Sequence, residues 1–330
     1  MNRPRKCLWW IPLIAMSCGL VVSCNRAKTN RTFGFAQEGA ESDWRTAETE
    51  SVKSEANRRG TELKFSDAGG DQDKQVKAMR AFIAQQVDGI ILAPRVTTGW
   101  DDVLKEAKDK KIPVVLVDRG VSSSDSLYTT LIASDFVEEG RRAADWMAKH
   151  SLEDADWKGK HSDGQLNIVE LQGTAGSQPA TERKQGFTEA MSKHPGMQII
   201  DTQDGNFEVQ KGKDVMSAFL KKHGDKINAV YAHNDNMALG AIQAIEEDGR
   251  FKPGKDILIV SIDGIRDALK AIQAGKLNCS IECNPLLGPD AFDALDAAIL
   301  GKEIPKRKVE KDELFDASNV TPELISQRKY

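Results

Sequence analysis

Residues 89–117 read GIILAPRVTTGWDDVLKEAKDKKIPVVLV, and this stretch contains the pattern that decides the fold. The runs 89–93 (GIILA) and 113–117 (PVVLV) are continuously apolar, which predicts strands buried on both faces. The segment between them, 101–111, is predicted to be an amphipathic helix. A strand, a helix and a second strand form the repeating unit of a parallel sheet covered by helices.

The same alternation extends over most of the chain. The predicted strands are 32–37, 63–67, 89–93, 113–117, 128–134, 166–171, 198–202, 229–233, 257–262 and 277–282. The predicted helices are 44–59, 72–86, 101–111, 135–150, 181–192, 210–223, 234–247, 266–274 and 289–300. About five strands precede Ser134 and as many follow, which indicates two doubly wound parallel-sheet lobes rather than one large sheet.

The end of the chain indicates how the two lobes are joined. A last extended piece near 308–315 predicts that the chain returns to the first lobe and crosses back, giving a three-stranded hinge. We therefore expect residues 31–134 plus 284–312 in an N-terminal lobe and 135–283 plus 313–330 in a C-terminal lobe. A length of 330 residues suits two such lobes.

Charge and the N-terminus restrict the classes of function. The formal charge of −4 provides no basic field for nucleic acid. Residues 1–23 have a basic start and an apolar run of about 15 residues at 8–22, too short to span a bilayer comfortably. They are predicted to be a signal peptide. The run ends in VVSC at 21–24, which resembles the lipobox of bacterial lipoproteins.

The lipobox implies cleavage before Cys24, a lipid on its sulfur, and a short tether over 24–30. Cys18 is a weaker second candidate, and a plain secretory signal is the alternative reading. The lipoprotein prediction places the protein in the periplasm or cell envelope, anchored only through its lipid.

Of the remaining cysteines, Cys279 and Cys283 would lie roughly 13 Å apart in one strand. That separation predicts free, buried thiols instead of a disulfide.

Ligands of open parallel sheets bind beyond the carboxyl ends of the strands, so the residues that follow each predicted strand are the candidates for a binding site. They are mostly Asp, Asn and Arg, with one large aromatic residue: Glu41, Trp44, Arg45, Asp118, Arg119, Asp135, Arg183, Asn234 and Asp263. Planar polar groups pair with vicinal hydroxyls, and an aromatic ring such as that of Trp44 packs on the apolar face of a sugar. The set favours a monosaccharide, although helix capping alone explains many such residues.

Six segments, taken in their order along the chain, resemble a known protein family. They are 41–49 (ESDWRTAET), 104–109 (LKEAKD), 169–174 (VELQGT), 230–235 (VYAHND), 252–258 (KPGKDIL) and 261–264 (SIDG). The chain resembles the periplasmic sugar-binding proteins of ABC importers of the ribose and galactose type, and among them the galactofuranose-binding proteins. The resemblance covers nearly everything from residue 32 to 300. It implies the two-lobed type I fold, a monosaccharide ligand, permease and ATPase partners, a monomer, and no cofactor.

The resemblance also implies roles for particular residues. Those matching ligand-binding positions of the family are Glu41, Trp44, Arg45, Asp118, Arg119, Arg183, Asn234 and Asp263, with Asp135 and Phe207 at positions that often face the cleft. There are departures at three places: Asp43 stands where related proteins have glycine, Phe136 replaces an asparagine, and Cys283 replaces a glutamine of ribose binders. These changes put the identity of the sugar in doubt, with a pentose or another small polyol as alternatives.

Enzymatic function is not expected from the motifs. The chain has no dinucleotide-binding or P-loop glycine signature, and its histidines and cysteines lack the spacing of a zinc site. The loop 173–177 (GTAGS) could cradle an anion, His233 could act as a base, and Asp118 with Asp263 could mimic a glycosidase pair. We prefer to interpret the loop as part of the cleft rim, His233 as a structural histidine, and the two carboxylates as groups that bind sugar hydroxyls.

Two other classes of protein use this fold. Repressors with this fold carry a DNA-binding N-terminus, whereas this chain begins with a predicted export signal. A sensor that presents sugar to a membrane receptor remains an alternative.

Overall fold

The computed structural model describes residue 1 and residues 31–151 and 164–330. These residues contain two six-stranded sheets. The predicted signal peptide (1–23), Cys24 and the tether (24–30) lie outside residues 31–330, so their prediction stays untested. Within the described parts of the chain, no helix has the length and apolar character needed to cross a membrane.

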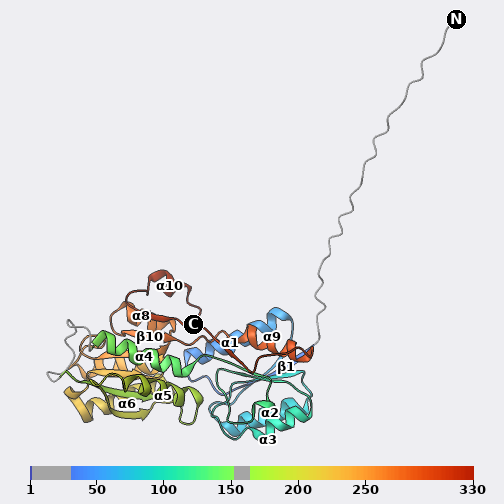
Figure 1. Cartoon of the computed structure of the whole chain (residues 1–330), viewed down its shortest axis with the longest axis horizontal. Helices are drawn as coiled ribbons and strands as arrows, with labels where there is room; N and C mark the ends of the chain where they lie inside the picture. Colours follow the sequence, from blue (N-terminus) through green and yellow to red (C-terminus); the bar gives the residue numbers. More distant parts are fainter. Residues whose placement is uncertain (2–30, 152–163) are drawn as a thin grey trace.

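The first sheet has the strand order β11-β5-β4-β3-β1-β2, with all neighbouring strands parallel. Its strands are β1 (Thr32–Gln37), β2 (Glu62–Asp67), β3 (Gly89–Leu92), β4 (Val114–Val117), β5 (Thr130–Ala133) and β11 (Arg307–Val309). Its helices are α1 (Asp43–Arg59), α2 (Gln72–Ala84), α3 (Asp101–Asp109) and α9 (Gly288–Ile299). Helix α1 packs on α9 and α2 packs on α3, and Figure 1 shows the two pairs on opposite sides of this lobe.

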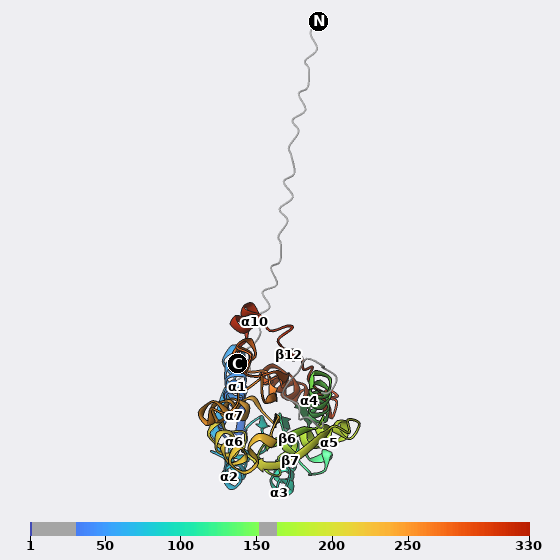
Figure 2. The same cartoon turned by 90° about the vertical axis from the view of Figure 1, so that its left-hand side faces the viewer.

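The second sheet has the order β12-β10-β9-β8-β6-β7. Its strands are β6 (Leu166–Gln172), β7 (Met197–Asp204), β8 (Ala229–Ala232), β9 (Leu258–Asp263), β10 (Cys279–Glu282) and β12 (Leu314–Asp316). Its helices are α4 (Phe136–Ser151), α5 (Gln178–Met191), α6 (Val209–His223), α7 (Asp235–Asp248), α8 (Arg266–Gln273) and α10 (Pro322–Gln327). Figure 2 shows α6 and α7 on one side of β6 and β7, and α4 and α5 on the other.

The predicted doubly wound fold is confirmed, and its decisive strands are buried as expected. Every residue of β3 and β4 is buried, because helices cover both faces of the parallel sheet. Helix α5 begins three residues before its predicted start at 181. The Ser177 side chain accepts a hydrogen bond from the Ala180 amide, and Pro179 occupies the first turn, so both residues favour the earlier start.

The extended piece predicted near 308–315 returns to the first lobe and crosses back, as expected. It consists of two strands in different sheets: β11 pairs in parallel with β5, and β12 pairs antiparallel with β10. The second sheet therefore has one antiparallel edge. Extended residues look alike in sequence, and only the crossing between the lobes separates these two strands.

The chain passes three times between the two sheets: after β5, after β10, and between β11 and β12. One carboxyl group connects the three crossings. Oδ1 of Asp312 accepts hydrogen bonds from the Ser134 hydroxyl at 3.1 Å and from the Asn284 amide at 3.2 Å. Burial raises the pKa of Asp312 to about 8, and the nearby Glu139 carboxyl adds to the shift.

Candidate ligand-binding site

A cavity lies between the two lobes, at the carboxyl ends of their strands. Nine of the ten predicted site residues line it: Glu41, Trp44, Arg45, Asp118, Arg119, Arg183, Phe207, Asn234 and Asp263. Ser42, Pro179 and Cys283 complete the lining. Parallel strands direct the following loops to one sheet edge, which is why residues far apart in the chain meet here.

Asp135 is the predicted residue that the structure does not place at this cavity. Its side chain is exposed, and Oδ1 accepts a hydrogen bond from the Glu138 amide at the start of α4. This is the helix-capping role that an aspartate at a strand-to-helix junction commonly has.

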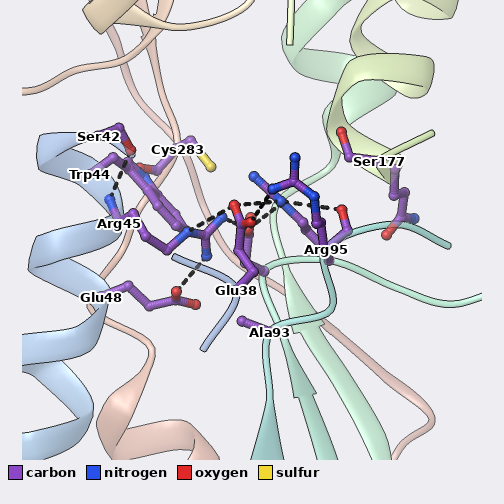
Figure 3. A network of polar contacts seen from close by, with 12 residues as sticks. Glu38, Ser42, Trp44, Arg45, Glu48, Ala93, Arg95, Ser177 and Cys283 are labelled. Atoms are coloured by element: carbon purple, nitrogen blue, oxygen red, sulfur yellow. Dashed lines mark hydrogen bonds and ion pairs between the residues drawn. The ribbon is translucent and has the colours of Figure 1, made fainter. Parts of the chain in front are cut away.

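Arg45 is the centre of a buried ionic network on the N-terminal lobe. Ser42 caps α1 by accepting a hydrogen bond from the Arg45 amide, which places the arginine in the first turn. Nη2 of Arg45 lies 2.6 Å from Oδ2 of Asp118, and Nη1 lies 2.6 Å from Oε2 of Glu48. Figure 3 shows Arg45 on α1 beside Glu48. Three carboxylates, including Glu41 at 3.2 Å, hold this guanidinium in place.

Glu38 is a member of this network that the sequence search did not select. Oε1 of Glu38 accepts from Arg119 at 2.9 Å. Oε2 of Glu38 accepts from Arg95 at 2.9 Å (Figure 3). Burial alone would raise the pKa of Glu38, but Arg119, Arg45 and Arg95 outweigh it and lower the value to about 2. The sequence feature that could have identified Glu38 is its position directly after β1. Glu38 fixes two arginines, one of which lines the cavity.

Trp44 is oriented by a bond to the hinge. Its indole Nε1 donates a hydrogen bond of 2.6 Å to the carbonyl oxygen of Cys283, and the Arg45 guanidinium lies 4.9 Å from the ring centroid. The side chain is buried, so this donor needs a partner, and the partner fixes the plane of the ring. Cys279 and Cys283 are free and buried, as predicted.

Arg183 has the corresponding position on the C-terminal lobe. Its Nε lies 2.7 Å from Oε2 of Glu139, Nη1 donates to the carbonyl of His233 at 2.7 Å, and Nη2 lies 3.6 Å from Asp263. Burial raises the pKa of Asp263, while Arg183 opposes this shift. Glu139 was not among the predicted residues because it lies within α4, away from any strand end.

Phe207 lines the cavity from the C-terminal lobe, whereas Trp44 lines it from the N-terminal lobe. A Cβ atom at Gly173 would lie 1.9 Å from the Phe207 ring, so only glycine at 173 permits this packing. The amide of Asn234 donates to the carbonyl of Phe207 at 3.1 Å, and its oxygen caps α7 by accepting from Met237. The Arg119 guanidinium lies 5.3 Å from the ring centroid, across the gap between the lobes.

Three lining residues have left-handed backbone conformations, which non-glycine residues seldom adopt. The φ angles are 60° at Asp118, 66° at Phe207 and 126° at Asp263. Strained conformations of this kind persist where surrounding structure holds them, and they concentrate at functional sites.

Three hydrogen bonds join the lobes across the cleft. The amide of Thr97 donates to the Gly176 carbonyl at 3.0 Å, and the amide of Gly120 donates to Oε1 of Gln178 at 2.5 Å. Nδ2 of Asn236 in α7 donates to Oδ2 of Asp43 in α1 at 3.1 Å. The lobes are therefore closed on each other. Asp43 takes part in this closure.

The arrangement suits binding of hydroxyl groups better than covalent chemistry. His233 does not line the cavity: it is fully buried, its Nε2 lies 3.1 Å from Glu170, and burial lowers its pKa. Within the described parts of the chain, no group of His, Cys, Asp and Glu residues has metal-binding geometry. A buried polar atom beside the cavity, Oε2 of Glu41, has no hydrogen-bond partner among the described residues. Such an atom is available to a polyol.

Comparison with known proteins places this geometry in a family. The chain is 47% identical over 292 residues to the galactofuranose-binding protein YtfQ of Escherichia coli K12, covering 88% of each chain. A crystal structure of a galactofuranose binding protein superposes with a TM-score of 0.85 at 45% identity, covering 91% of this chain and 98% of the other. The binding protein of the arabinose ABC transporter from Shewanella sp. ANA-3, bound to L-arabinofuranose, gives 0.83 at 47% identity and covers 90% and 95%. Residues 33–303 match the periplasmic binding protein domain, and with these relatives the chain belongs to that family.

Proposed function

We propose that this protein is the substrate-binding lipoprotein of an ABC sugar importer, and that it binds a galactofuranose-like monosaccharide between its lobes. The observation that carries the proposal is the inter-lobe cavity lined by Trp44, Phe207 and paired arginine and aspartate side chains. Arg45 with Asp118 and Arg183 with Asp263 present planar donors and acceptors from opposite lobes.

The furanose assignment is supported by the related proteins. One is named for galactofuranose, and another was solved with L-arabinofuranose. Both ligands contain five-membered rings. Galactose-like ligands come first in our proposal, with a pentose as the nearest alternative.

Binding would proceed by hinge closure. A sugar held by Trp44, Asp118 and Arg119 completes its hydrogen bonds only when Arg183 and Asp263 approach from the other lobe. The closed state therefore has more contacts with the ligand than the open state, and the ligand shifts the population toward it. The permease and ATPase subunits would recognise the closed form. No covalent step is proposed, and the protein would act without a cofactor, as a monomer.

The lobes are proposed to comprise residues 31–134 plus 284–312 and residues 135–283 plus 313–330. The crossings near Ser134, Cys283 and Asp312 agree with these bounds. After cleavage of the signal peptide 1–23, a lipid on Cys24 would hold the protein at the membrane through the 24–30 tether. The location would be the periplasm or cell envelope.

Thermal unfolding of residues 25–330 tests the ligand class. The panel contains galactose, arabinose, ribose, xylose, fructose, glucose and methyl β-D-galactofuranoside. A ligand at 100 times its Kd stabilises the fold by about 2.7 kcal/mol, which raises Tm by a few degrees. A Tm increase confined to galactose and the furanoside supports the proposal. A Tm increase with a pentose would mean that the imported sugar is a pentose. No shift with any sugar rejects the sugar-binding function.

A further inference from the structure

A second hollow, here called the outer hollow, lies beside the ligand cavity. It encloses about 740 Å³, part of it open to solvent, and residues of both lobes line it. Glu41, Gly70 and Arg95 contribute from the N-terminal lobe, and Thr174, Asn206 and Glu208 from the C-terminal lobe. Glu41 also lines the ligand cavity, so the two spaces share a wall.

The outer hollow lies on the side of the cleft away from the hinge. Gly70 follows β2, and Asn206 and Glu208 follow β7. Strands β2 and β7 are the edge strands at the ends of the two sheets opposite β11 and β12, the strands next to a hinge crossing. A ligand in the inner cavity therefore has the hinge at one end and the outer hollow at the other.

The side chains of the outer hollow are polar and partly uncommitted. Oε2 of Glu41 has no hydrogen-bond partner within residues 31–151 and 164–330. Nη1 of Arg95 donates to Glu38, a carboxylate that it shares with Arg119, which leaves the other guanidinium donors of Arg95 available. Among the described residues, the side chains of Asn206 and Glu208 make no hydrogen bond or ion pair. Such groups match sugar hydroxyls.

Glycines keep this space open. Gly69 and Gly70 have φ angles of 59° and 77°, which disfavour other residues there. A Cβ at Gly70 would lie 3.0 Å from Nη1 of Arg95. The turn after β2 thus forms a wall without side chains, directly beside the arginine.

We infer that the protein also accepts a disaccharide, with a terminal furanose unit in the inner cavity and a second, glycosidically linked sugar in the outer hollow. This inference rests on the proposed sugar-binding function and extends its ligand class from monosaccharides to short oligosaccharides. Glu41 lines both spaces, so the inference places the glycosidic linkage beside its carboxyl group.

Calorimetric titration of residues 25–330 tests the inference with three probes: D-galactose, methyl β-D-galactofuranoside and a β-D-galactofuranosyl disaccharide. The disaccharide is expected to bind within tenfold of the methyl glycoside, or more tightly. The variant Glu208→Trp fills the outer hollow and is expected to weaken disaccharide binding at least tenfold. It should change the Kd of D-galactose by less than twofold. Glu303→Trp, at an exposed loop position, is the matched control and should change neither value.

The outcomes distinguish failure of the disaccharide inference from failure of the proposed sugar-binding function. Disaccharide binding more than tenfold weaker than methyl glycoside binding overturns the outer site, and so does an equal loss for both in Glu208→Trp. If D-galactose binds and neither glycoside does, the monosaccharide function stands and the disaccharide inference fails. If none of the three probes binds, the proposed function fails together with the inference.

Discussion

The guanidinium of Arg45 lies 2.6 Å from the carboxylate of Asp118, although 73 positions separate the two residues in the chain. The same carboxylate lies 3.2 Å from Nε of Arg119. All three side chains are buried. Asp118 therefore holds two cations in fixed planes at the wall of the cavity, where a sugar hydroxyl can join the network.

Asp118→Asn should weaken sugar binding by about 1.5–3 kcal/mol, because it removes a charged acceptor while keeping the side-chain shape. This corresponds to a Kd increase of roughly 10-fold to 150-fold. Calorimetric titration with the best sugar of the panel measures the effect. Asp125→Asn, which changes an exposed aspartate of the same lobe, should bind like the wild type. Unchanged affinity in Asp118→Asn would remove this carboxylate from the binding site.

Asp43→Ala should loosen the closed state, because it deletes the bond that Asn236 donates across the cleft. We expect sugar affinity to fall by about 0.5–1.5 kcal/mol, mostly through faster dissociation. Stopped-flow tryptophan fluorescence gives the two rates. Asp73→Ala is a matched control, since Asp73 is likewise an acidic residue in the first turn of a helix and is exposed. Equal dissociation rates for Asp43→Ala and Asp73→Ala would show that this bond does not hold the lobes together.

Asp312→Asn should make the protein more stable than the wild type at pH 8 but not at pH 4. Burial raises the folded-state pKa of Asp312 to about 8, whereas its ordinary value is 3.8. Between these pH values the unfolded chain has lost a proton that the folded chain retains, so this group's stabilising contribution is lost as pH rises. Asparagine does not titrate, and its oxygen can still accept from Ser134 and Asn284.

Urea unfolding at several pH values measures this difference. The stability of Asp312→Asn relative to the wild type should increase by at least about 1 kcal/mol from pH 4 to pH 8. Glu303→Gln, an exposed substitution, should follow the wild-type curve at every pH. Parallel curves for Asp312→Asn and the wild type would mean that Asp312 does not retain its proton in the hinge.

Cys24→Ser should release the protein from the membrane, because serine cannot form the thioether that carries the diacylglycerol. Detergent-phase partitioning of the expressed full-length chain separates the lipid-bearing and lipid-free forms. Cys18→Ser is the control, because Cys18 is the weaker second candidate for the lipidated residue. If Cys18→Ser and not Cys24→Ser enters the aqueous phase, the cleavage site is six residues earlier.

The strands and helices could be predicted because their signals are local. The buried runs of β3 and β4 and the cap at Ser42 lie within a few residues of the elements they define. The search of strand ends also found most of the cavity lining, since parallel strands carry their following loops to one edge. It selected Asp135 as well, because a capping aspartate and a ligand-binding aspartate look the same in sequence.

The sequence alone determined the alternation of strands and helices, the two-lobed architecture and the residue types at the cleft, because each follows from short-range periodicity and from where strands end. Only the tertiary structure decided that Glu38 and Glu139 fix the arginines, and that a second hollow shares Glu41 with the ligand cavity. These features depend on distances between segments far apart in the chain. Such distances are set by how the two lobes pack and close, and no local pattern encodes them.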